Sequence, residues 1–246
     1  MANSLRRPLA LFVVALVTSV TLRALPASPP QTGPTPAERV AALKQSLAAS
    51  QKQIRQYEWV ETTIISLKGE EKSRKQQRCY YGADGTLQKL PVDSAAAAKP
   101  AAPSSGRRGG RVAQAVVENK KDDMKDYMEQ AAGLIQKYVP PNPEDIQRAK
   151  DTVKVDTPAP GRARLTFADY VLPGDRLMVD VDAAANRLLG LSVASYLGKK
   201  DDTVTLDVKM GALADGTGYT AETTLDAKAK NIRVVVQNTG HRPIVK

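Results

Sequence analysis

The chain contains few side chains suited to acid–base, nucleophilic or metal chemistry. Its single histidine, His241, stands close to the C-terminus beside Arg242 and Pro243. A histidine-dependent catalytic triad or a histidine-rich metal site would have to use this residue, and terminal segments are seldom ordered enough to form such a site. We therefore predict that His241 lies in a frayed tail and has no catalytic role.

Acidic residues offer a second kind of chemistry. Asp180, Asp182 and Asn186 place oxygen ligands near a turn, but their spacing lacks the third ligand, the glycine and the distal glutamate of an EF-hand loop. Asp and Asn favour turns by themselves, and we adopt that interpretation over a calcium site. The sequence selects no pair among its 26 acidic residues for glycoside hydrolysis. We expect a non-enzymatic protein without metal or cofactor; an envelope hydrolase stays open as an alternative.

Two further motifs carry no recognisable chemistry. Cys79 is the only cysteine, so it forms no internal disulfide, and we predict a small buried or half-buried strand residue rather than a reactive thiol. The motif GRRGGR falls within 93–111, a low-complexity stretch that we predict to be a disordered insertion. Because it does not join a strand to a helix and has no interleaved aromatic residues, we expect neither a phosphate-binding loop nor a nucleic-acid partner.

Basic residues crowd one predicted strand. Lys72, Arg74, Lys75 and Arg78 fall on both of its faces. A strand that is polar on both faces belongs at a sheet edge or in a projecting hairpin, where positive charge also opposes aggregation. The second interpretation is a contact strip for an anionic envelope component.

The N-terminal segment predicts export. Arg6 and Arg7 precede an apolar run over 9–22, which is followed by small residues and prolines, the layout of a signal peptide. The run is shorter than the roughly 20 residues needed to span a bilayer. We predict a signal peptide over 1–27, a proline-rich tether over 28–34, and one domain over 35–246. The mature protein is expected to be periplasmic, or otherwise extracellular, and monomeric, without a transmembrane segment.

The charge of the chain is strongly positive. The net charge of +10 includes three arginines within the first 27 residues, and without them 33 basic and 26 acidic residues leave +7. Such a charge suits an anionic partner and also simply favours solubility.

Two segments have helical periodicity. Thr35 as N-cap, Pro36 at the first helical position and Glu38 form the start of a helix that we predict to run to about Gln56. A helical insertion is predicted over 113–150, ending its first helix at Pro140 and continuing with a short helix capped by Asn142. Its apolar stripe consists of Met124, Tyr127, Met128, Ala131, Leu134 and Tyr138.

The remaining segments predict about ten strands. A meander turning at Lys68-Gly69 and Asp84-Gly85 is followed, after residue 150, by seven strands joined by connections short enough only for antiparallel neighbours. Alternation predicts one buried and one polar face, and so many strands should curl under their own twist. The fold class is α+β: a large curled antiparallel sheet, or half-barrel, with the N-terminal helix and the inserted helical pair packed on its concave face. The alternation is clearest where Val204, Leu206 and Val208 oppose Thr205, Asp207 and Lys209.

The order of these elements, including YEWVETTI and YVLPGDRLMVDVDAAANRLLGLSVASY, resembles the half-barrel superfamily of periplasmic outer-membrane lipoprotein carriers. The resemblance covers the chain from about Thr35 onward and lies in element order and pattern. It implies a curved sheet, lidded by helices, whose concave face holds acyl chains. The 93–111 insertion and the polar second strand depart from it, and no cargo-sensing arginine can be matched.

The leading hypothesis is an exported protein that binds an apolar or lipid-like ligand, such as a lipid or lipidated cargo, between sheet and helices. Periodicity suggests that the ligand is lined by Trp59, Met124, Tyr127, Met128, Leu134 and Tyr138. The alternative is an envelope structural or interaction module with a filled core, which contacts an anionic partner through the basic strand.

Overall fold

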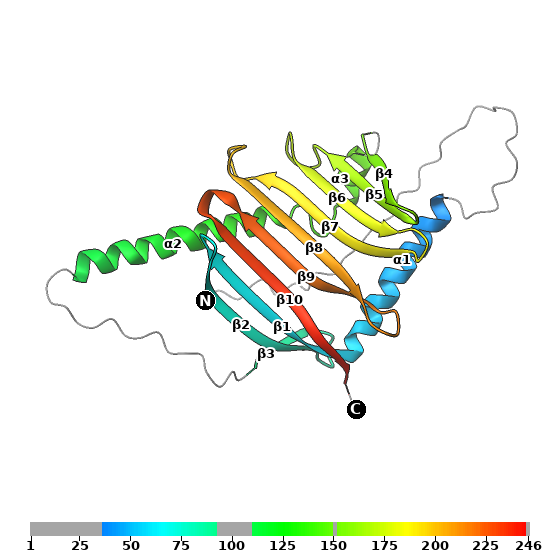
Figure 1. Cartoon of the computed structure of the whole chain (residues 1–246), viewed down its shortest axis with the longest axis horizontal. Helices are drawn as coiled ribbons and strands as arrows, with labels where there is room; N and C mark the ends of the chain where they lie inside the picture. Colours follow the sequence, from blue (N-terminus) through cyan, green and yellow to red (C-terminus); the bar gives the residue numbers. More distant parts are fainter. Residues whose placement is uncertain (1–35, 93–109, 150–151, 245–246) are drawn as a thin grey trace, which may run out of the picture.

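A computed structural model describes residues 36–92, 110–149 and 152–244 (Figure 1). The predicted signal peptide and tether, Thr35 and residues 93–109 of the predicted disordered insertion lie outside the described residues. Gly110 and Arg111 belong to a helix, so the prediction of disorder was wrong for these two residues. The helix formed by the residues that follow begins at Gly110 and so includes both positions.

The order of helices and strands follows the predicted one. Helix α1 (Pro36–Gln53) begins at the predicted proline and passes through a 3-10 turn, η1 (Ile54–Gln56), into β1 (Tyr57–Leu67). Strand β2 (Glu70–Tyr81) returns through a turn in which Lys68 and Gly69 both have positive φ, as a tight hairpin of type I′ requires. The remaining elements are β3 (Leu87–Pro91), α2 (Gly110–Ile135), α3 (Pro143–Ala149), β4 (Lys154–Ala159), β5 (Arg162–Ala168), β6 (Arg176–Asp182), β7 (Arg187–Tyr196), β8 (Thr203–Ala212), β9 (Gly218–Ala227), η2 (Lys228–Lys230) and β10 (Ile232–Pro243).

All ten strands belong to one open antiparallel sheet, which confirms the predicted sheet type. The strand order is β3-β2-β1-β10-β9-β8-β7-β6-β5-β4, so adjacent strands are consecutive in the chain except for β10 and β1, and β3 and β4 form the two edges. The first and last strands of the chain, β1 and β10, therefore lie side by side in the interior of the sheet, near its β3 edge (Figure 1). The sheet is visibly twisted and curved, as expected for this number of strands.

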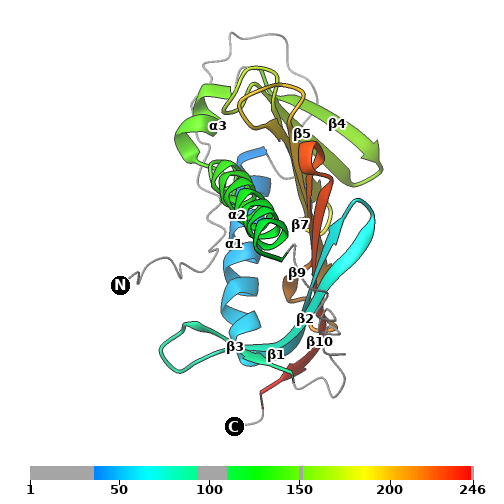
Figure 2. The same cartoon turned by 90° about the vertical axis from the view of Figure 1, so that its left-hand side faces the viewer.

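The three helices lie on one side of the sheet, which we call the helix-side face (Figure 2). Helix α1 contacts β7 and β9. Helices α2 and α3 contribute Tyr127, Leu134 and Ala149 to a core that they share with the strands. The opposite surface, which we call the outer face, carries the polar side chains of the same strands.

The helical insertion begins at Gly110, earlier than the predicted residue 113, and its first helix ends before the predicted Pro140. Helix α2 ends at Ile135, so Tyr138 lies in the turn that follows rather than on the helix. The backbone N–H of Glu144 donates to the Asn142 side chain at 3.0 Å, which confirms Asn142 as the cap of α3. Apolar spacing alone does not separate the last turn of a helix from a turn that keeps the same side buried.

The loop between β5 and β6 is held by a buried carboxylate. Asp175 is 1% exposed, and its side chain accepts the backbone N–H groups of Tyr170, Val171 and Leu172 at 2.5, 3.0 and 2.6 Å. These bonds compensate for the burial of the charge. They also fix the loop against which the end of α2 packs.

Candidate functional site

Strand register divides the apolar side chains of the helix-side face into three cross-strand rows. The first row lies nearest α2 and is buried except for the half-buried Leu67; its members are Leu67, Ile232, Ala227, Val204 and Ser195. The second row is Ile65, Val234, Leu225, Leu206, Val193, Leu177 and Phe167. The third row is Thr63, Val236, Thr223, Val208, Leu191, Val179 and Leu165.

Burial falls along the second row toward β1, and the third row is half-buried almost throughout. In the second row, Leu177 is fully buried, Leu225 and Val234 are half-buried, and Ile65 is 40% exposed. In the third row, only Leu191 is buried. We call the incompletely covered part the half-buried strip; it consists of Ile65, Thr63, Val208, Thr223, Leu225, Val234 and Val236. The core is therefore filled along the first row and along the β5–β8 part of the second row, and the half-buried strip over β8, β9, β10 and β1 is incompletely covered.

Helix α1 lies on the same side of the sheet as the half-buried strip but buries little of itself. None of its described side chains is buried, and Leu43 and Leu47 are half-buried. Its C-terminal end is fastened to the turn between β8 and β9: the N–H of Gly218 donates to the Ser50 hydroxyl at 3.0 Å, and Gln53 donates to Asp215 at 3.4 Å. The helix is thus fixed at one end by polar contacts and is weakly packed along its length.

The predicted lining residues are divided between two regions. Tyr127, Leu134 and Tyr138 lie in the core, and Met124 and Met128 pack on its margin. Trp59 lies elsewhere, on the same face of β1 as Thr63 of the half-buried strip, where its indole N–H donates to Asn238 at 3.0 Å. The structure therefore does not bring the six residues together, because the α2 stripe packs near the Leu67 end of β1 and Trp59 lies near its other end.

Tyr138 anchors the end of α2 through a buried polar cluster. Its hydroxyl donates to Asp175 at 2.5 Å and lies 2.7 Å from the Ser195 hydroxyl. Burial and the hydrogen bond to Asp175 raise the pKa of Tyr138 well above its ordinary value. Every member of the cluster has a partner, so it is suited to holding structure rather than to nucleophilic chemistry.

His241 is ordered, which contradicts the predicted frayed tail. It lies in β10, which extends to Pro243 because it pairs with β1, and its ring stacks 5.8 Å from that of Trp59 and lies 4.0 Å from that of Tyr219. Burial lowers the pKa of His241, since the charged imidazolium is disfavoured there. The histidine is part of an aromatic cluster at the end of the sheet.

Cys79 is a fully buried residue of β2, as predicted. Burial raises the pKa of its thiol to about 11. On the same helix-side face, Lys89 of β3 donates to both carboxylate oxygens of Glu61 at 2.7 Å. The charges of Glu61 and Lys89 therefore balance each other. The Cys79 thiol is protonated at neutral pH.

The basic residues of β2 have different environments. Only the Gln77–Tyr81 part of β2 pairs with β3. The segment that carries Lys72, Arg74 and Lys75 therefore forms an edge of the described sheet, as the sheet-edge interpretation predicted. Lys72 pairs with Glu70 at 2.5 Å and Arg74 with Glu71 at 2.8 Å. Arg78 lies 3.9 Å from Glu58, which also binds Arg242. Lys75 is exposed and pairs across the strands with Thr63, which places it on the helix-side face.

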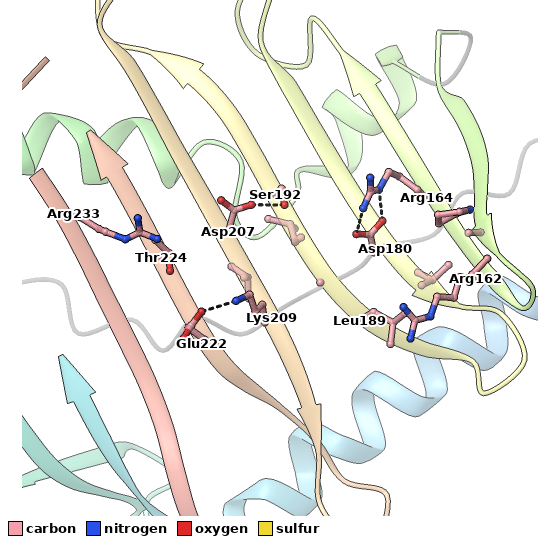
Figure 3. A pocket seen from close by; sticks show the side chains of 17 residues that line it. Arg162, Arg164, Asp180, Leu189, Ser192, Asp207, Lys209, Glu222, Thr224 and Arg233 are labelled. Atoms are coloured by element: carbon pink, nitrogen blue, oxygen red, sulfur yellow. Dashed lines mark hydrogen bonds and ion pairs between the residues drawn. The ribbon is translucent and has the colours of Figure 1, made fainter. Parts of the chain in front are cut away.

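The outer face has a shallow depression of about 460 Å³ that crosses several strands (Figure 3). Its cations and carboxylates pair between neighbouring strands. Arg164 donates to both oxygens of Asp180 at 2.6 and 2.8 Å, and Lys209 donates to Glu222 at 2.8 Å. Gly190, which has no side chain, lies between them on β7. This polar and largely compensated surface suits solvent or a polar partner better than an apolar ligand.

The turn interpretation of the acidic motif is confirmed. Asp182 accepts the N–H groups of Ala184 and Ala185 at 3.1 and 2.9 Å, and Asn186 has a positive φ. Asp180 is bound to Arg164. Within the described ranges, no group of three or more His, Cys, Asp or Glu side chains is arranged to hold a metal ion.

Comparison of the chain with protein-family models and with curated proteins gives no match. In the part of the chain that the structure describes, no helix has the length and apolarity needed to cross a membrane.

Proposed function

We propose that this protein is an exported, non-enzymatic binding protein that holds an apolar or lipid-like ligand on the half-buried strip, beneath its helices. The observation that carries the proposal is the fall in burial along the second row, from fully buried Leu177 to Ile65, which is 40% exposed. A contiguous apolar surface left incompletely covered is a common feature of ligand-binding faces. The resemblance to periplasmic lipoprotein carriers supports the same function and the half-barrel description, with the helices on the concave side.

The strip is large enough to provide useful affinity. It crosses four strands, which corresponds to about 14 Å at the usual spacing between strands. Burial of each CH₂ group of an acyl chain contributes about 0.8 kcal/mol before the costs of binding, so a single chain lying on the strip can supply several kcal/mol. The proposed ligand lining is therefore on β1, β8, β9 and β10 and not on the α2 stripe that the sequence suggested.

Two neighbouring valines of β10 allow a matched test. Val236 lies on the half-buried strip, whereas Val235 lies on the outer face, and both are half-buried. The probe is N-phenyl-1-naphthylamine, a neutral apolar dye, and Trp59 is the only tryptophan of the chain and lies on the same face of β1 as Thr63. Energy transfer from Trp59 to the bound dye therefore reports binding directly.

The expected result is saturable binding of the dye that Val236→Gln weakens at least several-fold and Val235→Gln leaves nearly unchanged. Thermal unfolding by circular dichroism of both variants controls for loss of fold. Equal weakening by the two variants, or no saturable binding to the wild type, contradicts the proposal and favours an interaction module with a closed core.

A further inference from the structure

From the position of Lys75 we infer that the ligand of the half-buried strip is a long-chain fatty acid whose carboxylate binds the Lys75 ammonium. The inference rests on the function proposed above and adds the chemical class of the ligand. It depends on where this lysine stands, on its lack of an ionic partner, and on the absence of competing charge along the rows.

Lys75 stands at one end of the third row. It pairs with Thr63 of β1, and the row continues through Val236 and Thr223 to Val208. From β2 to β8 the row crosses four strand spacings, or about 19 Å, which is the length scale of an extended long-chain fatty acid. A cation at the end of an uncharged row of valine and threonine side chains matches an amphiphile with one charged end.

The charge of Lys75 is uncompensated in the described part of the chain. The structure places no carboxylate there within ion-pair distance of Lys75, although Lys72, Arg74 and Arg78 of the same strand each have a glutamate partner. Glu61, the carboxylate on the same face of β1, is occupied by Lys89 at 2.7 Å. Lys75 is therefore the basic residue of β2 that remains free to bind a ligand anion.

The class of anion follows from the number of donors. A phosphate group is usually held by several donors or by bidentate arginines, whereas one ammonium matches a singly charged carboxylate. The two rows of the half-buried strip also lie side by side as one continuous surface beyond Lys75 rather than as two separate channels. A single-chain carboxylate therefore fits this surface better than a two-chain phospholipid.

The test compares ligands that differ only in their head group. Binding of myristate and of 1-tetradecanol, each below the concentration at which it aggregates, is measured on the purified protein through Trp59 fluorescence and native mass spectrometry. Lys75→Gln is compared with Arg74→Gln, which removes the same charge from the next residue, on the outer face. We expect Lys75→Gln to weaken myristate binding about three- to fivefold, the effect of an exposed ion pair, without changing tetradecanol binding. Arg74→Gln should change neither.

Other outcomes separate the two proposals. Equal binding of both ligands to the wild type, unaffected by Lys75→Gln, overturns the assignment of the head group and leaves the apolar site intact. Absence of binding of either ligand overturns the proposed function as well. Tighter, Lys75-dependent binding of myristoyl lysophosphatidylglycerol than of myristate shows that the site prefers a phosphate head group and contradicts the fatty-acid assignment.

Discussion

At the scale of single residues, the polar groups of the core are structural. Asp175 joins the β5–β6 loop, Tyr138 and Ser195 into one buried cluster in which each described polar atom has a partner. Removing such a carboxylate leaves several buried donors unpaired, because a side chain without an acceptor cannot replace its hydrogen bonds. The cluster is thus a point at which one substitution affects both α2 and the sheet.

Asp175→Ala should lower the free energy of unfolding by about 3 kcal/mol, because three backbone N–H groups and the Tyr138 hydroxyl lose their acceptor. Urea unfolding followed by circular dichroism measures this change. Asp201→Ala, at an exposed position in the turn between β7 and β8, is the control and should change the stability little. A similar small change for Asp175→Ala would show that water replaces the carboxylate.

The Cys79 thiol should resist modification in the folded protein. It is fully buried, and burial raises its pKa to about 11, so at pH 8 it is both inaccessible and protonated. Ellman's reagent should release none of its coloured thionitrobenzoate with the native protein and one equivalent after denaturation in guanidinium chloride. Rapid reaction of the native protein would mean that β2 and β3 separate readily.

At the scale of elements, α1 depends on its polar fastening. Asp215 accepts the Tyr57 hydroxyl at 2.6 Å and the N–H of Thr217 at 2.9 Å, and these hydrogen bonds lower its pKa to about 2. A carboxylate whose pKa is lowered on folding contributes its full stabilisation of the folded state above about pH 4. This contribution is lost as the pH falls through about 2.

Hydrogen exchange tests this fastening. In the wild type, amide protection at the C-terminal end of α1 should decrease as the pH is lowered from 4 to 2, after correction for the intrinsic exchange rate. In Asp215→Asn, protection should already be low at pH 4 and should vary little over the same range. A wild-type profile in Asp215→Asn would show that packing of α1, rather than Asp215, holds the helix.

Element existence was predictable from the sequence, whereas the fine registers were not. Turn residues and alternation identified ten antiparallel strands and the buried face of β8, because both signals are local. His241 was misplaced because its order comes from pairing between β10 and β1, which are distant in sequence. Tyr138 was placed on a helix because the turn after Ile135 keeps the same side buried.

The candidate site was only partly visible in the sequence. Trp59 was selected from strand periodicity and Lys75 as one of four basic residues on one strand, but their relation to Val236 requires the β1–β10 pairing. The α2 stripe looked like a ligand lining because apolar periodicity is the same for a core and for a cavity wall. Strand register and the gradient of burial across the rows separate the two.

At the scale of the whole molecule, a sheet this wide has more apolar surface than three helices on one side cover. Helices α2 and α3 complete a core with the first row and with the β5–β8 part of the second row, and the half-buried strip remains over β8, β9, β10 and β1. Polar ion pairs across the outer face keep that side in water. The helix-side face thus combines a covered part with a part whose apolar side chains are incompletely covered.

Native mass spectrometry of the protein, exported in a bacterial host and purified without detergent, tests this account most directly. We predict one small amphiphile per chain, released on denaturation and recovered by solvent extraction, with its occupancy reduced in Val236→Gln and retained in Val235→Gln. A mass equal to that of the polypeptide alone, unchanged after incubation with myristate and with extracted envelope lipids, would contradict the account.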